Sequence, residues 1–321
     1  MAKRAKRVKP ITLRNNAPPA APPPPAAATD ASDSKPRGRR KASTQKLIAS
    51  YHTLNKKLHA VLKAGDSTAA GSIKTQMEAM GGLHAYQRAS LRGGNEKKGL
   101  GACGSWLVQQ LRAELAELRD SEAEKLVVVA ENGEEEVEEV EEEAKTGSPA
   151  TQQKLKLKLL DVGALDGGTY SKQASWIDVT SIDLNPQCQT VRKQDFFERP
   201  RPTGAHEKFN VLCLSLVVNF VGDPKLRGDM LIHARRFLLP RGLLFLVLPL
   251  PCVKNSRYMS HAHLLAILKS IGYELVKHHF ARKLALYLLR RVEQFKLQDW
   301  TKTQMNPGIE RNNFCIVVKR S

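Results

Sequence analysis

The chain has little cysteine, few aromatic residues and no long apolar run. Its 321 residues include five cysteines, and no two of them lie within four residues of each other. An odd number of cysteines without CxxC spacing is not typical of a disulfide framework or of a structural zinc site. Because no signal peptide or apolar stretch of membrane-spanning length is found, we expect a reduced, intracellular, soluble protein without membrane or metal partners.

Negative charge is also in short supply. Lys and Arg total 51 against 32 Asp and Glu, which gives a formal net charge of +19. The excess lies in two blocks: residues 1–41 carry eleven basic residues against two acidic ones, and residues 252–321 carry thirteen against four. Because Lys and Arg neutralise phosphates, nucleic acid is the leading partner class. Tails that only keep the protein soluble or address it to the nucleus are the alternative.

The first 150 residues lack the aromatic and β-branched residues of a full hydrophobic core, so we expect one main domain in the second half. We predict a disordered, basic, Pro/Ala-rich tail over 1–43, a helical region over 44–130, and an acidic linker over 131–152. Apolar residues at helical spacing predict helices at 44–63, 73–80 and 106–118. The basic clusters at 3–7 and 37–41 indicate the nucleus and nucleolus.

Residues 153–321 alternate between short apolar runs and helical patterns. The predicted strands are Leu157–Val162, Val179–Ile182, Phe209–Ser215 and Leu243–Leu248, and the predicted helices are Tyr170–Ala174, Lys225–Leu239 and His261–Ile271. This alternation predicts an α/β fold with a mostly parallel, Rossmann-like sheet and helices on its faces. Leu284–Arg291 and Asn313–Val318 are predicted to pair with each other as antiparallel final strands.

The stretch from Leu159 to Asn185 carries the first candidate site. A buried strand ends near Asp161, turns through Gly163, and is followed twenty residues later by Asp183 at the end of the next strand. One glycine turn and one strand-end carboxylate at this spacing are typical of a nucleotide-binding βαβ unit. Gly163 lets the backbone approach a ligand, and Asp183 can accept hydrogen bonds from both ribose hydroxyls.

The same turn favours one cofactor over another. S-adenosylmethionine and NAD both have free ribose hydroxyls, but Leu165 stands where a dinucleotide site has the glycine that admits the pyrophosphate. S-adenosylmethionine has no pyrophosphate, and Asp161 can interact with its amino group, directly or through water. The sequence therefore favours a class I S-adenosylmethionine-dependent methyltransferase with a helical N-terminal extension, and disfavours a dehydrogenase.

Later strand ends add candidate residues. Asp195 is placed to accept from the adenine amino group and Phe196 to cover the ring, with a helix cap and plain core packing as the alternatives. Because ligands bind at the carboxyl ends of parallel strands, further residues should line the transfer pocket. Ser215, at the end of one strand, is assigned to the cofactor. The residues assigned to the substrate are Asn219, Pro249, Leu250, Pro251, Asn255, Arg257 and Tyr258.

The last three of these suggest the substrate class. An amide, a guanidinium and an aromatic ring at 255, 257 and 258 suit the reading and stacking of a flipped base or the holding of its phosphate, and a solvent-facing loop is the alternative. Methyl transfer from a sulfonium to a ring nitrogen needs alignment above all. No catalytic acid or base is assigned.

Five blocks of sequence carry a resemblance to a known family. They are YQRASLRGGN at 86–95, IDLNPQC at 182–188, QDFFERPRP at 194–202, LSLVVNFVGDPKLRGDML at 214–231 and LVLPLPCVKNSRY at 246–258. In them the chain resembles the family that methylates adenine N1 in fungal large-subunit (25S) ribosomal RNA. The resemblance implies S-adenosylmethionine as cofactor, ribosomal RNA or the pre-60S particle as partner, and the nucleolus as location.

The resemblance also places residues and leaves an alternative open. It implies cofactor roles for Gly163 and Asp183, and an adenine-side position for Asp195 and Phe196. Animal proteins similar to this family are thought to sense S-adenosylmethionine and to regulate protein partners, so a non-catalytic sensor is the competing function. The basic tails favour the enzyme, because a sensor needs no phosphate-binding surface. We expect a monomer.

Overall fold

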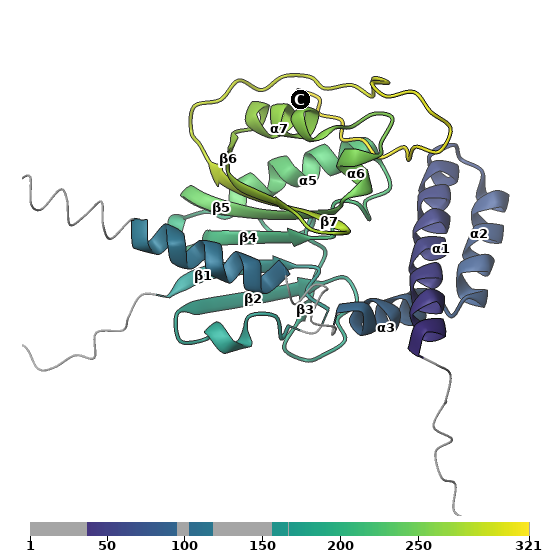
Figure 1. The fold of residues 1–321 in the computed structure, drawn as a ribbon, viewed down its shortest axis with the longest axis horizontal. Coiled ribbons are helices and arrows are strands. Elements are labelled where there is room, and N and C mark those ends of the chain that lie inside the picture. Colours follow the sequence, from purple (N-terminus) through teal and green to yellow (C-terminus); the bar gives the residue numbers. More distant parts are fainter. Residues whose placement is uncertain (1–36, 95–102, 118–155, 166, 321) are drawn as a thin grey trace, which may run out of the picture.

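A seven-stranded sheet organises the computed structural model, which describes residues 37–94, 103–117, 156–165 and 167–320 (Figure 1). Its strands are β1 Leu157–Val162, β2 Ile177–Asp183, β3 Arg192–Lys193, β4 Phe209–Ser215, β5 Leu238–Pro249, β6 Tyr273–Phe280 and β7 Leu284–Arg291. The order across the sheet is β3-β2-β1-β4-β5-β7-β6, and only the pairings of β7 with β5 and β6 are antiparallel. The predicted mostly parallel α/β fold is confirmed.

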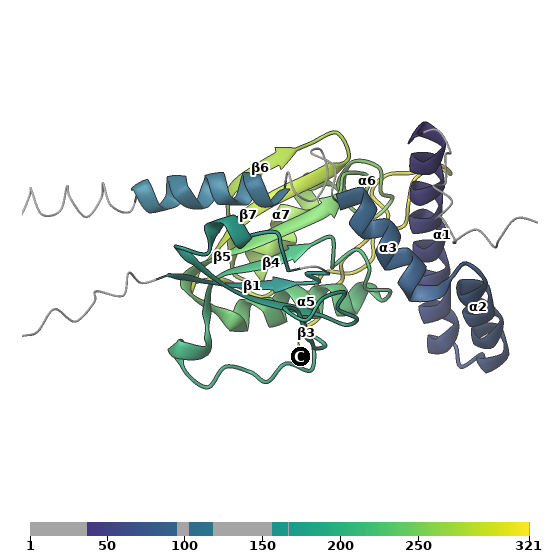
Figure 2. The same cartoon turned by 90° about the horizontal axis from the view of Figure 1, so that it is seen from below.

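The central strands are apolar along their length because both faces of the sheet are covered. On one face pack α5 Pro224–Phe237, α6 Pro251–Lys254 and α7 His261–Ser270. Asp223 caps α5 by accepting from the backbone N–H of Lys225, and Ser260 caps α7 in the same way at His263. Figure 2 shows α5 below the sheet and helical residues 103–117 above it.

Helical residues 103–117 cover the sheet face on which the sequence predicts a crossover helix at Tyr170–Ala174. The segment Tyr170–Ala174 contains only the one-turn 3-10 helix η1 Ser171–Gln173, so it leaves much of that sheet face uncovered. Leu107 and Leu111, both fully buried, pack there against Leu159 and Phe245. A helix from the N-terminal half of the chain thus completes the core of the C-terminal domain.

The predicted final strand pair is wrong. β7 pairs with β5 and with β6, whereas residues 313–318 make only an isolated bridge between Trp300 and Val318. The alternating residues Phe314, Ile316 and Val318 are buried in the core, which gives the segment the periodicity of a strand. β6 escapes prediction because it is an edge strand with exposed Lys277, His278 and His279.

Three further helices form a separate layer: α1 Arg37–Lys63, α2 Ser67–Ala79 and α3 Gly82–Gly94. The predicted helices at 44–63 and 73–80 are confirmed within α1 and α2. α1 begins inside the predicted tail 1–43, and α3 lies where the sequence predicts no helix. The rest of the tail and the acidic linker 131–152 lie outside the described residues, so the predicted boundaries stay predictions. We call α1–α3 the helical unit.

Two sequence expectations concern membranes and metals. No helix in the described part of the chain is long and apolar enough to cross a membrane. The same residues contain no group of three or more His, Cys, Asp or Glu side chains placed to hold a metal ion.

Candidate functional site

The carboxyl ends of β1, β2, β4 and β5 meet at one edge of the sheet, and the helical unit lies against that edge (Figure 1). α1 reaches the loop after β4, where the Asn55 side-chain amide donates to the carbonyl of Phe220 at 3.4 Å. α3 reaches the loop after β2 through Gln87. The site therefore has walls from both halves of the chain.

Gly163 makes the turn after β1 in a conformation that favours glycine. Its φ is +77°, and its backbone N–H donates to the carbonyl of Ile182 on β2 at 2.8 Å. A Cβ atom at this position would lie 2.8 Å from Cγ2 of Val217, in the loop after β4. The absence of a side chain therefore lets β1, β2 and the loop after β4 lie close together.

Two carboxylates lie on either side of this turn in the sequence, Asp161 before it and Asp183 after it. Asp183 is half-buried, and its Oδ1 accepts from the backbone N–H of Asn185 at 2.7 Å. Burial raises the pKa of Asp183, while the hydrogen bond from Asn185 works in the opposite direction. Asp161 is 6% exposed and lies in register between Ser181 of β2 and Cys213 of β4. Both predicted carboxylates thus lie at the ends of neighbouring strands.

Gln87 is a site residue that sequence reasoning missed. It is 3% exposed, and its Nε2 donates to the backbone carbonyl of Asn185 at 2.8 Å. Its Oε1 accepts from the side-chain amides of Asn185 and Gln187, the latter at 3.0 Å. Gln87 therefore joins α3 to the loop that follows the Asp183 carboxylate, at Asn185 and Gln187. Its only signal in the sequence is its place in the block at 86–95.

An aromatic cluster joins α1 and α3 to the loop after β4. Tyr51 and Tyr86 stack with ring centroids 4.7 Å apart, and the ring centroids of His52 and Phe220 are 3.7 Å apart. Burial, assisted by Lys56, lowers the pKa of His52 to about 4, and burial raises the pKa of Tyr86 to about 12. These rings are therefore neutral near pH 7 and pack as an apolar wall beside the site.

The end of β4 combines a strained backbone with an unpartnered acceptor. Leu216, directly after Ser215, has φ +60°, an unfavourable conformation for a residue with a side chain. Asn219 is 6% exposed, and its Oδ1 has no hydrogen-bond partner among the described residues. Strain and an unsatisfied buried oxygen are both costly, and they gather at sites where a ligand compensates for them.

The predicted cover for the cofactor adenine is wrong. Phe196 is 3% exposed and packs in the core against His233 and Phe237 of α5, so its ring is not available to a ligand. Asp195 Oδ1 accepts from the backbone N–H of Phe197 at 2.8 Å, a local turn of the capping type. Two apolar side chains are presented to solvent near these positions: Leu184, 63% exposed and next to Asp183, and Phe197, 36% exposed.

The residues predicted to bind substrate after β5 lie at the end of that strand and around α6. Pro249 ends β5, Leu250 precedes α6, and Pro251 is its exposed first residue. The exposed Asn255 side chain donates to the carbonyl of Glu310 at 3.4 Å. Tyr258 is half-buried, with Nζ of Lys302 4.5 Å above its ring.

Arg257 has a different role from the predicted one. Its Nε donates to the carbonyl of Gly308 at 2.9 Å, Nη2 donates to the carbonyl of Ile309 at 2.9 Å, and Nη1 donates to Oδ1 of Asn313 at 2.5 Å. These three bonds use three of the five guanidinium N–H donors and hold the side chain against the C-terminal segment. We therefore assign Arg257 to the anchoring of the C-terminal segment.

Comparison with known proteins decides the family. The family model described as 25S rRNA (adenine(2142)-N(1))-methyltransferase, Bmt2, matches residues 71–316. The chain belongs to this family. The match to the Bmt2 family contains α3 with Gln87, helical residues 103–117 and the whole sheet, whereas α1 precedes it.

Two curated relatives have matching names. The 25S rRNA adenine-N(1) methyltransferase of Schizosaccharomyces pombe is 30% identical over 283 residues, which are 84% of this chain and 90% of that protein. The 25S rRNA (adenine(2142)-N(1))-methyltransferase of Saccharomyces cerevisiae is 38% identical over 162 residues, half of this chain. The chain thus spans about half the length of the Saccharomyces relative, 48%, in that match.

Solved structures give weaker likenesses. The N-methyltransferase NodS from Bradyrhizobium japonicum, in complex with S-adenosyl-L-homocysteine, has 15% identity and a TM-score of 0.33, over 43% of this chain and 80% of that one. A 1,6-didemethyltoxoflavin-N1-methyltransferase from Burkholderia thailandensis has 14% identity and a TM-score of 0.36, over 43% and 72%. The Bmt2 assignment does not depend on them.

Gln87→Ala in this Bmt2-family chain is expected to weaken S-adenosylmethionine binding by about tenfold, because all three hydrogen bonds from α3 to residues 185 and 187 are lost. The Asn185 loop next to Asp183 would lose its anchor on α3. Titration calorimetry measures the affinity, and thermal unfolding reports whether the fold survives. Arg88→Ala, which changes the exposed neighbour on α3, is the matched control. Equal affinities in both variants would remove Gln87 from the site.

Proposed function

We propose that this chain transfers a methyl group from S-adenosylmethionine to N1 of an adenine in large-subunit ribosomal RNA. The observation that carries the proposal is the grouping of Gly163, Asp183 and the unpartnered Asn219 Oδ1 at one sheet edge, in a chain of the Bmt2 family. The two curated relatives are named for this reaction on 25S rRNA. The cofactor supplies a methyl group already activated on a sulfonium.

The residues at the edge fit this cofactor. Gly163 makes the tight turn after β1 with positive φ, and the half-buried Asp183 retains one oxygen that takes no part in its bond to Asn185. We assign Asp183 to the ribose hydroxyls, Asp161 to the amino group and the exposed Leu184 to one face of the adenine. We also assign Ser215 and Asp195 to the cofactor.

Recognition of the substrate base is assigned to the end of β4. Adenine N1 has an in-plane lone pair, so it can be methylated without removal of a proton, and the chain needs no general base. The neighbouring exocyclic amino group is a donor, and Asn219 Oδ1 is a buried acceptor without a partner among the described residues. One hydrogen bond between them would satisfy the amide and orient N1. Pro249, Leu250 and Pro251 are assigned to the opposite wall.

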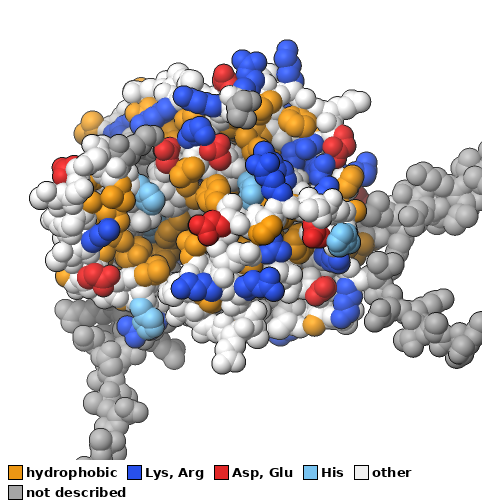
Figure 3. Space-filling view, turned by 180° about the vertical axis from the view of Figure 1, so that it is seen from behind, with side chains coloured by type: hydrophobic (Ala, Val, Ile, Leu, Met, Phe, Trp, Pro, Cys, Tyr) orange, Lys and Arg blue, Asp and Glu red, His pale blue; other side chains and the backbone are white. Residues whose placement is uncertain are grey.

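The proposed setting is the pre-60S particle in the nucleolus. The support is the net charge of +19 and the basic clusters at 3–7 and 37–41. Figure 3 shows Lys and Arg side chains spread over the face seen there, with hydrophobic side chains gathered between the helical unit and the sheet domain. A surface of this kind suits a folded RNA with both phosphates and exposed bases.

The test is transfer of labelled methyl from S-adenosylmethionine to unmodified large-subunit ribosomal RNA, both naked and in pre-ribosomes, followed by nucleoside analysis. We expect labelled 1-methyladenosine with the parent protein. Asn219→Ala is expected to lower turnover by about tenfold or more without changing cofactor affinity, because a buried hydrogen bond to the base is lost. Tight cofactor binding without label in either substrate would instead favour the sensor function.

A further inference from the structure

The loop formed by residues 305–313 presents two large apolar side chains to solvent, Met305 at 44% exposure and Ile309. Ile309 is 93% exposed, more than any other large hydrophobic residue in the described part of the chain. Its neighbours are Pro307, Gly308, Glu310 and Arg311, so the isoleucine lies among turn-forming and charged residues. A single exposed apolar residue is ordinary on a protein surface, and its meaning depends on how the loop is held and where it lies.

The loop is held rigidly. Besides the three bonds from the Arg257 guanidinium, the carbonyl of Arg257 accepts from the backbone N–H groups of Met305 and Asn306 at 2.8 and 3.0 Å. The Asn306 amide donates to the carbonyl of Ser256 at 3.0 Å, and Asn312 and Ser256 form a parallel bridge. Ile309 is therefore fixed outward and is not free to fold onto nearby apolar surface.

The loop also lies beside the candidate site. It is anchored on Asn255–Arg257, which follow α6 at the carboxyl end of β5. In Figure 1 the yellow C-terminal segment crosses above α7 and turns beside α6 and the Lys63 end of α1, and Figure 2 agrees. Three basic residues, Lys254, Lys302 and Arg311, lie in or next to the anchoring segments, and one acidic residue, Glu310, follows Ile309.

We propose that Ile309 is a wedge that enters the RNA base stack and occupies the space left when the target adenine turns into the pocket. The inference rests on the proposed function, because a base whose N1 is methylated must leave its pair and its stack. Apolar side chains on rigid supports do this in proteins that unstack nucleic acids. The basic surroundings favour RNA over a protein partner.

The first experiment compares two RNA hairpins that share the target adenine, one with it paired in a stem and one with it in an unpaired loop. We expect Ile309→Ala to lower methylation of the paired target by on the order of tenfold, the value of burying one large apolar side chain, and to leave the unpaired target unchanged. Ile309→Leu should behave like the parent. Phe295→Ala, which removes an exposed ring beside Arg235 at the opposite sheet edge, is the matched control.

The second experiment does not depend on methyl transfer. With 2-aminopurine at the target position of the paired hairpin, the parent is expected to raise its fluorescence on binding, and Ile309→Ala to bind without that rise. No rise with the parent, or equal rises with both proteins, would overturn the wedge, and so would an equal loss of methylation on both hairpins. A rise with the parent but no methylation of either hairpin would instead count against the proposed function and leave the wedge standing.

Discussion

Asp183→Ala is expected to weaken S-adenosylmethionine binding by about 100-fold while the sheet stays folded. A charge-assisted hydrogen bond contributes about 1.5–3 kcal/mol, and the proposed contact includes two ribose hydroxyls. Asp183 is half-buried at the very end of β2, so its truncation removes little packing. Titration calorimetry measures the affinity, and circular dichroism with thermal unfolding reports on the fold.

Asp183→Asn distinguishes the contribution of the negative charge at residue 183 from the contribution of its hydrogen bond to the local turn. Its side-chain oxygen can still accept from the backbone N–H of Asn185, so the loop keeps its shape while the carboxylate is lost. Because burial raises the pKa of Asp183, cofactor affinity in the parent should fall as the pH is lowered through a value above the usual range for aspartate. The asparagine variant should lack this dependence. Parent-like affinity in both variants would place the ribose elsewhere.

The first βαβ unit could be predicted from the sequence because its requirements are local. A turn that needs positive φ calls for glycine, and a strand-end carboxylate is recognised by its spacing from that turn. Gly163 and Asp183 therefore lie where the sequence predicts. The prediction that Phe196 covers the adenine is wrong because an aromatic residue after an acid is equally typical of core packing. Only the contacts with α5 show that Phe196 belongs to the core. The only signal for Leu184 in the sequence is its place in the block at 182–188, because exposure is a property of the fold.

Long-range contacts were beyond prediction from one sequence. The side chain of Gln87 meets Asn185, 98 residues away, and nothing in either segment encodes that contact. Helical residues 103–117 look like part of the helical unit from their amphipathic pattern, which says only that one face must be covered. The sheet face beneath them needed a helix because the segment after Gly163 supplies only η1.

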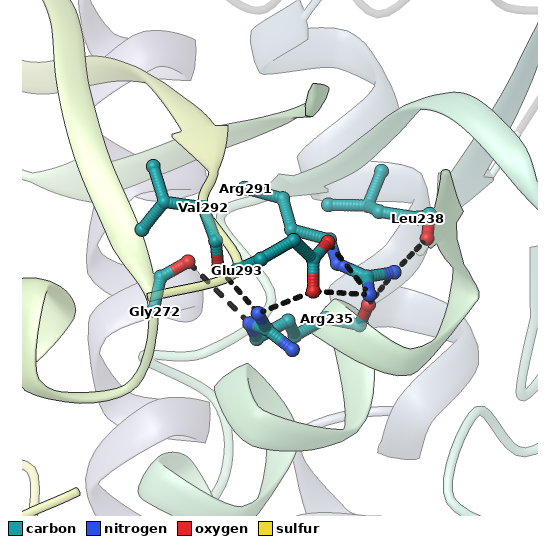
Figure 4. A network of polar contacts seen from close by, with 6 residues as sticks. All are labelled: Arg235, Leu238, Gly272, Arg291, Val292 and Glu293. Carbon is teal, nitrogen blue, oxygen red and sulfur yellow. Dashed lines mark hydrogen bonds and ion pairs between the residues drawn. The ribbon is translucent and has the colours of Figure 1, made fainter. Parts of the chain in front are cut away.

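The sequence also does not show which basic side chains are available to bind a partner. A count of Lys and Arg predicts a polyanionic partner, but several of these side chains hold the fold together. Figure 4 shows Arg235 and Arg291 sharing Glu293 while they donate to the main-chain carbonyls of Gly272, Val292 and Leu238. Like Arg257, these two arginines close turns, and they lie at the edge of the sheet opposite the candidate site. The RNA surface must be formed by other residues.

Gly228→Ala is expected to destabilise the protein by about 3 kcal/mol, at the upper end of the range for overpacked cores. Gly228 is buried on α5, and an added Cβ would fall far inside contact distance of the main-chain carbonyl oxygen of Val317. That carbonyl cannot move aside easily, because Val317 N–H donates to Pro224 at 2.9 Å and Arg227 holds the carbonyl of Cys315 at 2.7 Å. Thermal unfolding measures the loss.

Gly71→Ala on α2 is the matched control, because an added Cβ there would meet no atom within 4 Å. An alanine in an open helical position should stabilise by about 0.5–1 kcal/mol, so the two substitutions are expected to have opposite signs. Equal stabilities would mean that the C-terminal segment does not pack on α5 as described. The same segment continues back to the loop that carries Ile309. Loosening it at Gly228 should therefore also reduce methylation of a paired adenine more than that of an unpaired one, which links the packing of α5 to the handling of RNA.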